Sequence, residues 1–193
     1  MSHKKHTNQV RIIAGEWRGR RLPVIEAPGL RPTGDRVRET LFNWLGPHVI
    51  GARCLDLFAG SGALGLESLS RGAASVIFVE KSQAVLDGLI EATRAWPGID
   101  KAEFVCADAN DWLMHAHAPF DLVFLDPPFE STCIGQWCRA LVQQGLVRDG
   151  GRIYLESAKG QGLSEEALDP SLSMERQKVI GQVEISLVRY HSG

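Results

Sequence analysis

The sequence predicts an α/β fold in which a mostly parallel sheet is covered by helices on both faces. Three observations indicate this class. Apolar, strand-like runs alternate with helical patterns from residue 53 onward, a glycine-rich turn follows the first of these runs, and two strand-like runs close the chain with no helix between them. A chain of 193 residues is long enough to enclose one main hydrophobic core.

The first 50 residues precede the alternating pattern, and we expect residues 1–50 to form an extension ahead of a main domain of residues 51–193. In the extension, the strand-like runs 10–14 and 20–24 flank a turn that contains Gly15 and Gly19. Two short strands around a tight turn are typical of a β-hairpin. We therefore predict a small hairpin outside the main sheet.

A helix is predicted over residues 35–45, because Val37, Leu41, Trp44 and Leu45 recur at helical spacing. The pattern begins next to Thr33 and Asp35, either of which is a suitable N-cap, and it ends at Gly46-Pro47. The extension therefore contains a hairpin followed by one helix.

The main domain is expected to alternate strands and helices and then to close with an antiparallel hairpin. The predicted parallel strands lie near residues 53–58, 75–80, 101–106, 119–125 and 151–156. The predicted helices lie near residues 63–71, 82–95, 109–116 and 134–145. The closing strands are predicted at 173–180 and 182–190, joined at Gly181.

Composition excludes several classes of protein. No apolar run approaches the roughly 18 residues that a membrane span needs, and the polar, basic segment 1–9 has no signal-peptide core, so we expect a cytoplasmic protein without membrane contact. The four cysteines form no C-x-x-C pair and are expected to be reduced thiols. His3 and His6 lie in this polar terminus with no further ligand nearby, and we expect no metal site.

Basic charge is concentrated in the extension. Residues 1–40 contain nine Lys or Arg and four Asp or Glu, whereas the remaining 153 residues contain twelve and nineteen. This asymmetry is typical of a protein that binds a polyanion. We predict that seven arginines contact RNA or DNA phosphates and that one tryptophan between them stacks on a base; these residues are Arg11, Trp17, Arg18, Arg20, Arg21, Arg31, Arg36 and Arg38.

The segment 54–67 reads as a buried strand, a glycine turn and the start of a helix. Gly60 and Gly62 allow positive φ and close approach of a ligand to the backbone, while Gly65 lets the helix pack closely on the sheet. Glu80 follows Gly60 by 20 residues, at the end of the next predicted strand. This spacing fits a dinucleotide-binding fingerprint, so the segment predicts an adenosine-type cofactor and leaves NAD and S-adenosylmethionine open.

The turn Asp126-Pro127-Pro128-Phe129 directly follows the apolar run 120–125 and favours S-adenosylmethionine. Proline fixes φ and contributes no N–H, so the turn offers carbonyl acceptors beside one carboxylate and one aromatic ring. These groups suit a nucleobase amine that accepts a methyl group, and they have no role in hydride transfer. We predict that Asp126 and Pro127 accept the amine hydrogens and that Phe129 stacks on the base.

Each predicted cofactor residue lies just after a parallel strand, at the edge where open α/β sheets bind ligands. We expect Glu80 to accept hydrogen bonds from ribose hydroxyls and Asp108 to accept one from an adenine amine. A cap on the following helix is an open alternative for both. The predicted cofactor-binding residues are Asp56, Phe58, Ala59, Gly60, Ser61, Gly62, Glu80, Lys81, Asp108 and Ala109.

Almost the whole chain resembles the RsmD family of 16S rRNA guanine-N2 methyltransferases. The resemblance is carried by the hairpin motifs at 11–15 and 18–20, the segment Arg31 to Glu39 with its Arg-Pro-Thr run, the glycine loop 56–65 and the Asp-Pro-Pro-Phe turn. It implies a Rossmann-like class I methyltransferase fold with a seven-stranded, mostly parallel sheet and an antiparallel C-terminal strand. It also places Thr33, within the Arg-Pro-Thr run, among the RNA-binding residues.

The resemblance further implies methyl transfer from S-adenosylmethionine to N2 of the guanine at position 966 of 16S rRNA. We expect the substrate to be 16S rRNA within a partially assembled small ribosomal subunit, and the enzyme to be a monomer that needs no metal. Four alternatives are considered: a DNA adenine-N6 methyltransferase, a glutamine-N5 protein methyltransferase, an NAD-dependent oxidoreductase and a non-catalytic RNA-binding module on a methyltransferase scaffold.

Overall fold

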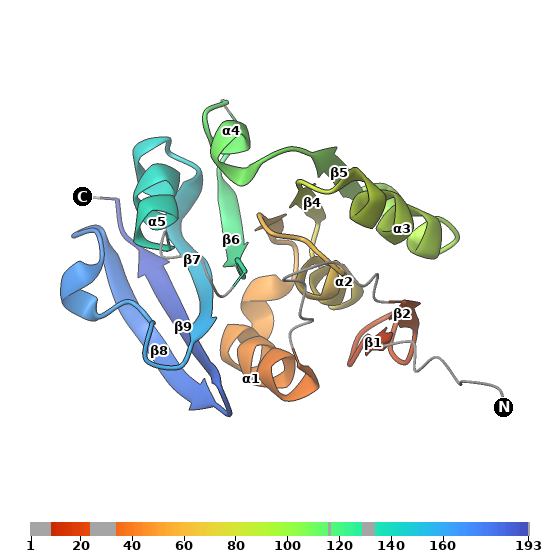
Figure 1. Cartoon of the computed structure of the whole chain (residues 1–193), viewed down its shortest axis with the longest axis horizontal. Coiled ribbons are helices and arrows are strands. Elements are labelled where there is room, and N and C mark those ends of the chain that lie inside the picture. Colours follow the sequence, from red (N-terminus) through yellow and green to blue (C-terminus); the bar gives the residue numbers. More distant parts are fainter. Residues whose placement is uncertain (1–8, 24–33, 116, 129–133, 193) are drawn as a thin grey trace, which may run out of the picture.

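The computed structural model describes residues 9–23, 34–115, 117–128 and 134–192, and it has the predicted α/β architecture. A seven-stranded sheet has the order β5-β4-β3-β6-β7-β9-β8, and a separate two-stranded sheet pairs β1 with β2 (Figure 1). Strands β3 to β7 are parallel to one another, while β9 is antiparallel to both β7 and β8. The seven-stranded sheet and its closing antiparallel strand are therefore confirmed.

The elements follow the predicted order closely. The strands are β1 (Gln9–Arg11), β2 (Arg21–Pro23), β3 (Arg53–Asp56), β4 (Ser75–Glu80), β5 (Ala102–Cys106), β6 (Phe120–Leu125), β7 (Val147–Ala158), β8 (Leu172–Ile180) and β9 (Val183–Tyr190). The α-helices are α1 (Asp35–Leu45), α2 (Ala63–Ser70), α3 (Gln83–Thr93), α4 (Ala109–Leu113) and α5 (Ile134–Gln143). Short 3₁₀ turns are η1 (Gly46–Val49), η2 (Ile99–Lys101) and η3 (Glu165–Ala167).

Helix α1 has the predicted bounds, but its predicted cap is wrong. Gly34 is the N-cap residue, and its carbonyl accepts hydrogen bonds from the amides of Val37 and Arg38. Asp35 is the first helical residue and makes no capping bond; its carboxylate instead accepts a 2.6 Å hydrogen bond from Arg38. Thr33 lies outside the described residues. The competing salt bridge explains why Asp35 does not cap the helix.

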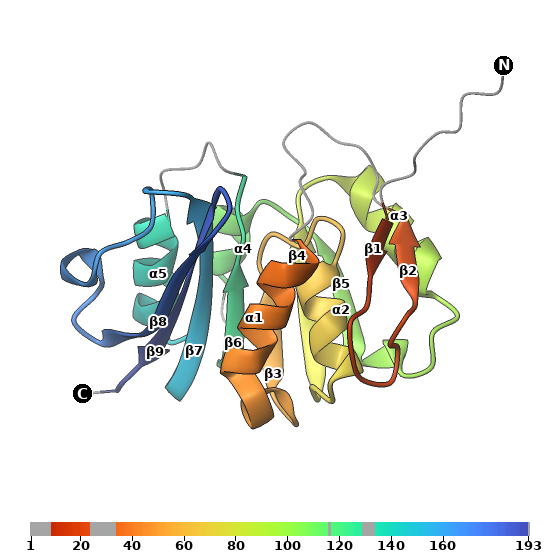
Figure 2. The same cartoon turned by 90° about the horizontal axis from the view of Figure 1, so that it is seen from below.

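Two hydrophobic clusters lie on opposite faces of the sheet. One contains buried side chains of α1, α2 and the β1–β2 hairpin, and the other contains those of α4 and α5. Figure 2 shows α1 and α2 side by side against the sheet, with the hairpin beside α2. Val10, Ile12 and Leu41 of the extension share the first cluster with Cys54 of β3. The extension thus packs into the main core, and its division from the rest at residue 50 remains a prediction.

Three of the four cysteines lie in the described part of the chain, and all three are free thiols. Cys54 and Cys138 are buried, and burial raises the pKa of Cys138 to about 12. None of the helices in the described ranges is long and apolar enough to cross a membrane.

Candidate active site

The glycine turn lies at the carboxyl edge of β3 and β4. Two backbone bonds hold it: Ala59 N–H donates to the Val79 carbonyl at 2.9 Å, and Gly62 N–H donates to the Ala59 carbonyl at 2.7 Å. Gly60 and Gly62 have φ of 49° and 73°, the left-handed region that favours glycine. Gly60 and Ser61 line a surface hollow together with residues of β2 and α3. Gly60 and Ser61 are half-buried at this hollow, and the approach of a ligand to the backbone of the turn stays a prediction.

Gly65 holds helix α2 against the sheet. A Cβ atom at this position would lie 2.3 Å from Cε1 of Phe78 and 2.9 Å from Cγ1 of Val76, both on β4. Such distances are too short for any side chain, so only glycine permits this approach. The predicted role of Gly65 in close packing is confirmed.

Asp56 is a buried carboxylate at the end of β3. Its Oδ2 accepts a 3.0 Å hydrogen bond from Gly65 N–H in the first turn of α2. Burial raises the pKa of Asp56, the hydrogen bond from Gly65 lowers it, and the negative charges of Asp126 and Glu80 raise it, so that together they bring it to about 7. The influence of Asp126 and Glu80 shows that three of the predicted site carboxylates gather at one edge of the sheet.

Glu80 ties the glycine turn to the start of α3. One carboxylate oxygen accepts from Gly60 N–H at 3.0 Å, and the other accepts from Ser82 N–H at 2.8 Å. Ser82 is the N-cap residue of α3 and α3 has no side-chain capping bond, so Glu80 holds the backbone just ahead of the helix, and its helix-capping alternative stays open. Each oxygen retains a second lone pair, and the predicted contact with ribose hydroxyls stays a prediction.

Asp108 caps helix α4, as its alternative interpretation predicts. Its Oδ1 accepts hydrogen bonds from the backbone and side-chain nitrogens of Asn110, at 2.9 Å and 3.0 Å. The Asp108 side chain is exposed and Ala109 beside it is buried, while Lys81 is exposed after β4. These residues continue the row of predicted cofactor contacts along the edges of β4 and β5.

Phe58 belongs to an aromatic cluster that the sequence analysis missed. Its ring lies 4.6 Å from that of Trp137 on α5, and Trp137 Nε1–H donates a 2.9 Å hydrogen bond to Asn110 Oδ1. The cluster connects the glycine loop to α4 and α5 on one side of the site. Helical periodicity alone assigns Trp137 to the core, so no sequence signal separates it from an ordinary packing residue.

The Asp-Pro-Pro turn begins directly after β6, at the same edge. Asp126 is half-buried, Pro127 is buried and Pro128 is exposed. Strand β3 lies between β4 and β6 in the sheet, so Asp126 after β6 and Glu80 at the end of β4 lie on opposite sides of β3. Phe129 lies outside the described residues, so its stacking role stays a prediction.

A buried Tyr154–Glu156 pair lies next to this turn. Leu125 of β6 and Leu155 of β7 are register partners, so the residues that follow them, Asp126 and Glu156, are neighbours at the sheet edge. The Tyr154 hydroxyl donates a 2.7 Å hydrogen bond to Glu156 Oε2. Desolvation, followed by the charges of Glu156 and Asp126, raises the pKa of Tyr154. The signal that the sequence analysis missed is an acid, Glu156, directly after the apolar run 153–155.

Four of the predicted RNA-binding arginines are exposed in the extension: Arg11, Arg18, Arg21 and Arg36. Arg20 is half-buried, and its guanidinium lies 5.1 Å from the ring centre of Trp96. Arg31 and Thr33 lie outside the described residues. The exposed four provide positive charge on the hairpin and on the first turn of α1.

Two predicted RNA contacts are wrong. Trp17 is 2% exposed; its ring packs edge-on against Trp96 at 5.1 Å, and its Nε1–H donates to the Pro97 carbonyl. Arg38 is fully buried and forms ion pairs with Asp35 and Glu67. Neither side chain reaches a surface where a nucleic acid could bind, because Trp17 is enclosed by Trp96 and Pro97, and Arg38 is buried against Asp35 and Glu67.

In the described ranges, no three His, Cys, Asp or Glu side chains form a group that could hold a metal ion.

Comparison with known proteins gives the family. The model of the family described as "Conserved hypothetical protein 95" matches residues 10–189. The protein "Ribosomal RNA small subunit methyltransferase D" of Escherichia coli (strain K12) is 46% identical over 177 residues, which cover 92% of this chain and 88% of the relative. The chain belongs to the RsmD family.

Solved structures share the fold of the RsmD-family chain. "Putative methyltransferase yhhF" from Escherichia coli has a TM-score of 0.88 at 41% identity, covering 96% of this chain and all of that one. A methyltransferase solved in complex with SAH has a TM-score of 0.65 at 17% identity, covering 83% of this chain and 50% of that one, a likeness of fold. The predicted class I methyltransferase fold is confirmed.

The raised pKa of Asp56 predicts a pH-dependent stability. The native carboxyl titrates near pH 7 and its ordinary pKa is 3.8, so between these values the folded state binds more protons than the unfolded state. The free energy of unfolding contributed by this group therefore falls as pH rises from about 4 to about 7. We expect Asp56→Asn to remove this decrease, which urea denaturation at pH 5 and pH 8 would measure.

Asp149→Asn is the matched control for this prediction. Asp149 is exposed, and its pKa is lowered by hydrogen bonds from Ser192, so its contribution to stability has the opposite sign and is present at high pH. An equal dependence on pH in the wild type and in Asp56→Asn would contradict the assignment.

Proposed function

We propose that this protein transfers a methyl group from S-adenosylmethionine to the exocyclic N2 of a guanine in small-subunit ribosomal RNA. One observation carries the proposal: Asp126 and its proline turn lie at the same sheet edge as the glycine turn, beside Asp56. The cofactor and the amine that accepts its methyl group can thus meet across one strand. The names of the relatives, which specify small-subunit ribosomal RNA, agree with it.

The residues at the edge fit S-adenosylmethionine. The glycine turn offers backbone with positive φ, and Glu80 and Asp126 supply negative charge for a ligand that carries a sulfonium and an amine. When bound, the cofactor supplies a methyl group on a positively charged sulfur. In this proposal Glu80 accepts from the ribose hydroxyls, and Asp108 accepts from the adenine amine while capping α4.

Asp126 and Pro127 perform the chemistry in this proposal by orienting the guanine amine. The lone pair of an exocyclic amine is delocalised into the ring, so the amine is a poor nucleophile. The Asp126 carboxylate and the Pro127 carbonyl accept the two N–H bonds and leave the nitrogen lone pair aimed at the methyl group. In this proposal the Asp126 carboxylate also takes the proton that the methylated nitrogen loses. Orientation and electrostatics therefore supply most of the rate enhancement.

The extension binds the RNA in this proposal. Arg11, Arg18, Arg21 and Arg36 are exposed and can contact phosphates, while a target base in a helix must be extruded to reach Asp126. We further propose that the substrate is a partially assembled small subunit in the cytoplasm and that the protein acts as a monomer.

The exposed arginines predict a specific weakening of RNA binding. Replacing Arg18 and Arg21 by Ala should weaken RNA binding and reduce the slope of log affinity against log salt by about 0.7–0.9 for each phosphate that is no longer neutralised. Cofactor affinity should not change, because both side chains are exposed on the hairpin. Binding titrations at several salt concentrations measure the slope.

Arg94→Ala is the matched control. Arg94 follows helix α3, is 70% exposed and pairs with Glu91 on the surface. Arg94→Ala should leave both the RNA affinity and the salt slope unchanged. If it weakened RNA binding as much as the replacement of Arg18 and Arg21, the binding would depend on general surface charge and not on the hairpin.

The direct test supplies labelled S-adenosylmethionine and compares naked small-subunit rRNA with partially assembled 30S particles. We expect label in the particle, recovered as N2-methylguanosine. Label in N6-methyladenine would show that the target is an adenine amine and not guanine N2. Absence of label from both substrates, with the cofactor bound, would support a non-catalytic binding role.

A further inference from the structure

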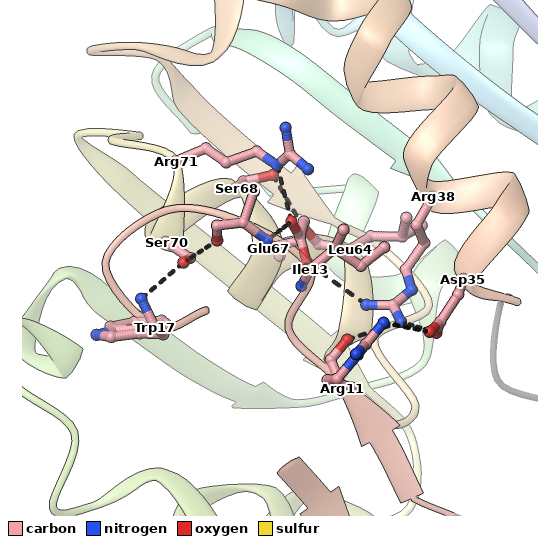
Figure 3. Close-up of polar contacts among 12 residues, drawn as sticks. Arg11, Ile13, Trp17, Asp35, Arg38, Leu64, Glu67, Ser68, Ser70 and Arg71 are labelled. Atoms are coloured by element: carbon pink, nitrogen blue, oxygen red, sulfur yellow. Dashed lines mark hydrogen bonds and ion pairs between the residues drawn. The ribbon is translucent and has the colours of Figure 1, made fainter. Parts of the chain in front are cut away.

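A buried carboxylate on α2 holds the hairpin in place. Glu67 is fully buried, and its two oxygens accept from the backbone amides of Ile13 at 2.8 Å and Ala14 at 3.0 Å (Figure 3). These amides lie in the chain between β1 and the hairpin turn, more than 50 residues away in sequence. Glu67 thus replaces the strand partner that this stretch of backbone lacks.

Two arginines share the same carboxylate. Arg71 Nε donates to Glu67 Oε1 at 2.8 Å, and Arg38 Nη1 lies 3.5 Å from Oε2. Arg38 also donates through Nη2 to the Arg11 carbonyl of β1 and to Asp35 at the start of α1. Arg38 Nε and Nη1 are buried without a hydrogen-bond partner, so Arg38 relies on the nearby carboxylates for its charge. Removing one partner of a buried ion pair leaves an uncompensated charge, so the hairpin, α1 and α2 depend on one another through this cluster.

Ser70, one turn further along α2, makes a second attachment. Its Oγ accepts from Trp17 N–H at 2.9 Å and donates to the Ala14 carbonyl at 2.5 Å, and its own carbonyl accepts from Glu16 N–H at 2.8 Å. Figure 3 shows Glu67 and Ser70 both directed toward the hairpin. The attachment therefore has two separate points on one helix.

The same helix belongs to the candidate active site. Helix α2 begins immediately after Gly62 of the glycine turn, and Gly65 in its first turn donates to Asp56. The hairpin also lies next to this turn, because Leu22 and Pro23 of β2 line one hollow with Gly60. The arginine-bearing hairpin is thus fixed to the element that carries the glycine turn.

We propose that Glu67 is a positioning residue for the reaction, which sets the RNA-binding hairpin relative to the glycine turn so that the target base reaches Asp126. The inference rests on the proposed function. Glu67 contacts neither RNA nor cofactor in this account. It acts through the backbone of Ile13 and Ala14, and through Arg38, which holds the start of α1.

Glu67→Gln and Ser70→Ala test the two attachment points separately. Glu67→Gln keeps the shape and one acceptor but removes the charge that faces Arg38 and Arg71; Ser70→Ala leaves those charges intact. We expect both to reduce kcat on 30S particles by up to about 10²-fold, the scale of an ångström misplacement. The salt slope of RNA binding should stay unchanged, because every exposed arginine remains. This distinguishes positioning from the removal of a phosphate contact.

Glu91→Gln is the matched control, since Glu91 is a 67% exposed helical acid paired with Arg94. Amide hydrogen exchange at Ile13 and Ala14 provides a readout that needs no RNA: exchange there should accelerate in Glu67→Gln while the strands β3 and β6 stay protected. Cofactor-binding stoichiometry reports the folded fraction of each variant.

Three results would overturn the inference. The first is a wild-type kcat in both variants. The second is a fall in kcat that is matched by an equal fall in cofactor-binding stoichiometry, because this signifies unfolding. The third is unchanged amide exchange at Ile13 and Ala14. Failure of the wild type to methylate RNA would instead remove the proposed function, and the exchange measurement would still show whether Glu67 fixes the hairpin.

Discussion

Asp126→Asn should abolish most methyl transfer while leaving the protein folded and able to bind both ligands. Asparagine keeps the shape of the side chain, but it is neutral and turns one acceptor into a donor facing the guanine amine. Removal of one oriented acceptor from a catalytic site lowers turnover by about 10²- to 10³-fold. Single-turnover kinetics with labelled S-adenosylmethionine measure the step, because they separate chemistry from product release.

Binding measurements decide what the lower turnover means. The affinities for S-adenosylmethionine and for RNA should stay close to those of the wild type, since the glycine turn and the exposed arginines are untouched. Asp149→Asn, on the half of β7 away from the active edge, is the matched control and should retain wild-type turnover. Turnover of Asp126→Asn within a small factor of the wild type would rule out the proposed role of this carboxylate.

Gly15→Ala should detach the hairpin and stop methylation of RNA. Gly15 has φ of 82°, and a Cβ atom there would lie 1.8 Å from the carbonyl oxygen of Ser70, a backbone atom that cannot rotate away. The strain and the clash together destabilise the docked hairpin by at least about 2 kcal/mol. A misplaced hairpin should reduce kcat/KM for 30S particles by about 10²-fold or more.

Gly19→Ala provides a control at a position with a similar backbone conformation and no clash. Gly19 has φ of 84°, and nothing lies within 4 Å of a Cβ atom built there. It should show only the strain of a left-handed residue, about 1–2 kcal/mol, and retain methylation at temperatures well below its melting point. Cofactor binding should survive in both variants. Equal activities would show that hairpin docking is not required.

The sequence predicts the elements of this fold well because their signals are local. Helix α1 has the predicted bounds, and the glycines at 60, 62 and 65 adopt the conformations or contacts expected of them. Strand β7 is longer than predicted, since it begins at Val147 and its pairing with β6 shifts between Phe120 and Leu122. Such an irregularity depends on the neighbouring strand, which no local pattern reports.

The errors at the site have a different cause, because burial of a charged or aromatic residue is decided by distant partners. Trp17 looks like a stacking ring among arginines, yet Trp96 and Pro97 enclose it. Arg38 looks like a surface charge, yet it is buried against Glu67. Glu67 is a charged residue in a short helix, and its burial depends on the docked hairpin together with Arg38 and Arg71.

The measurement that tests the central claim most directly uses 30S particles rebuilt with inosine in place of the guanosine at position 966, the target that the resemblance to the RsmD family implies. Inosine lacks only the exocyclic amine, so base stacking, phosphates and the other ring atoms are preserved. With labelled S-adenosylmethionine, we expect label in the guanosine particle and none in the inosine particle. Equal label in the two particles would contradict methylation of guanine N2.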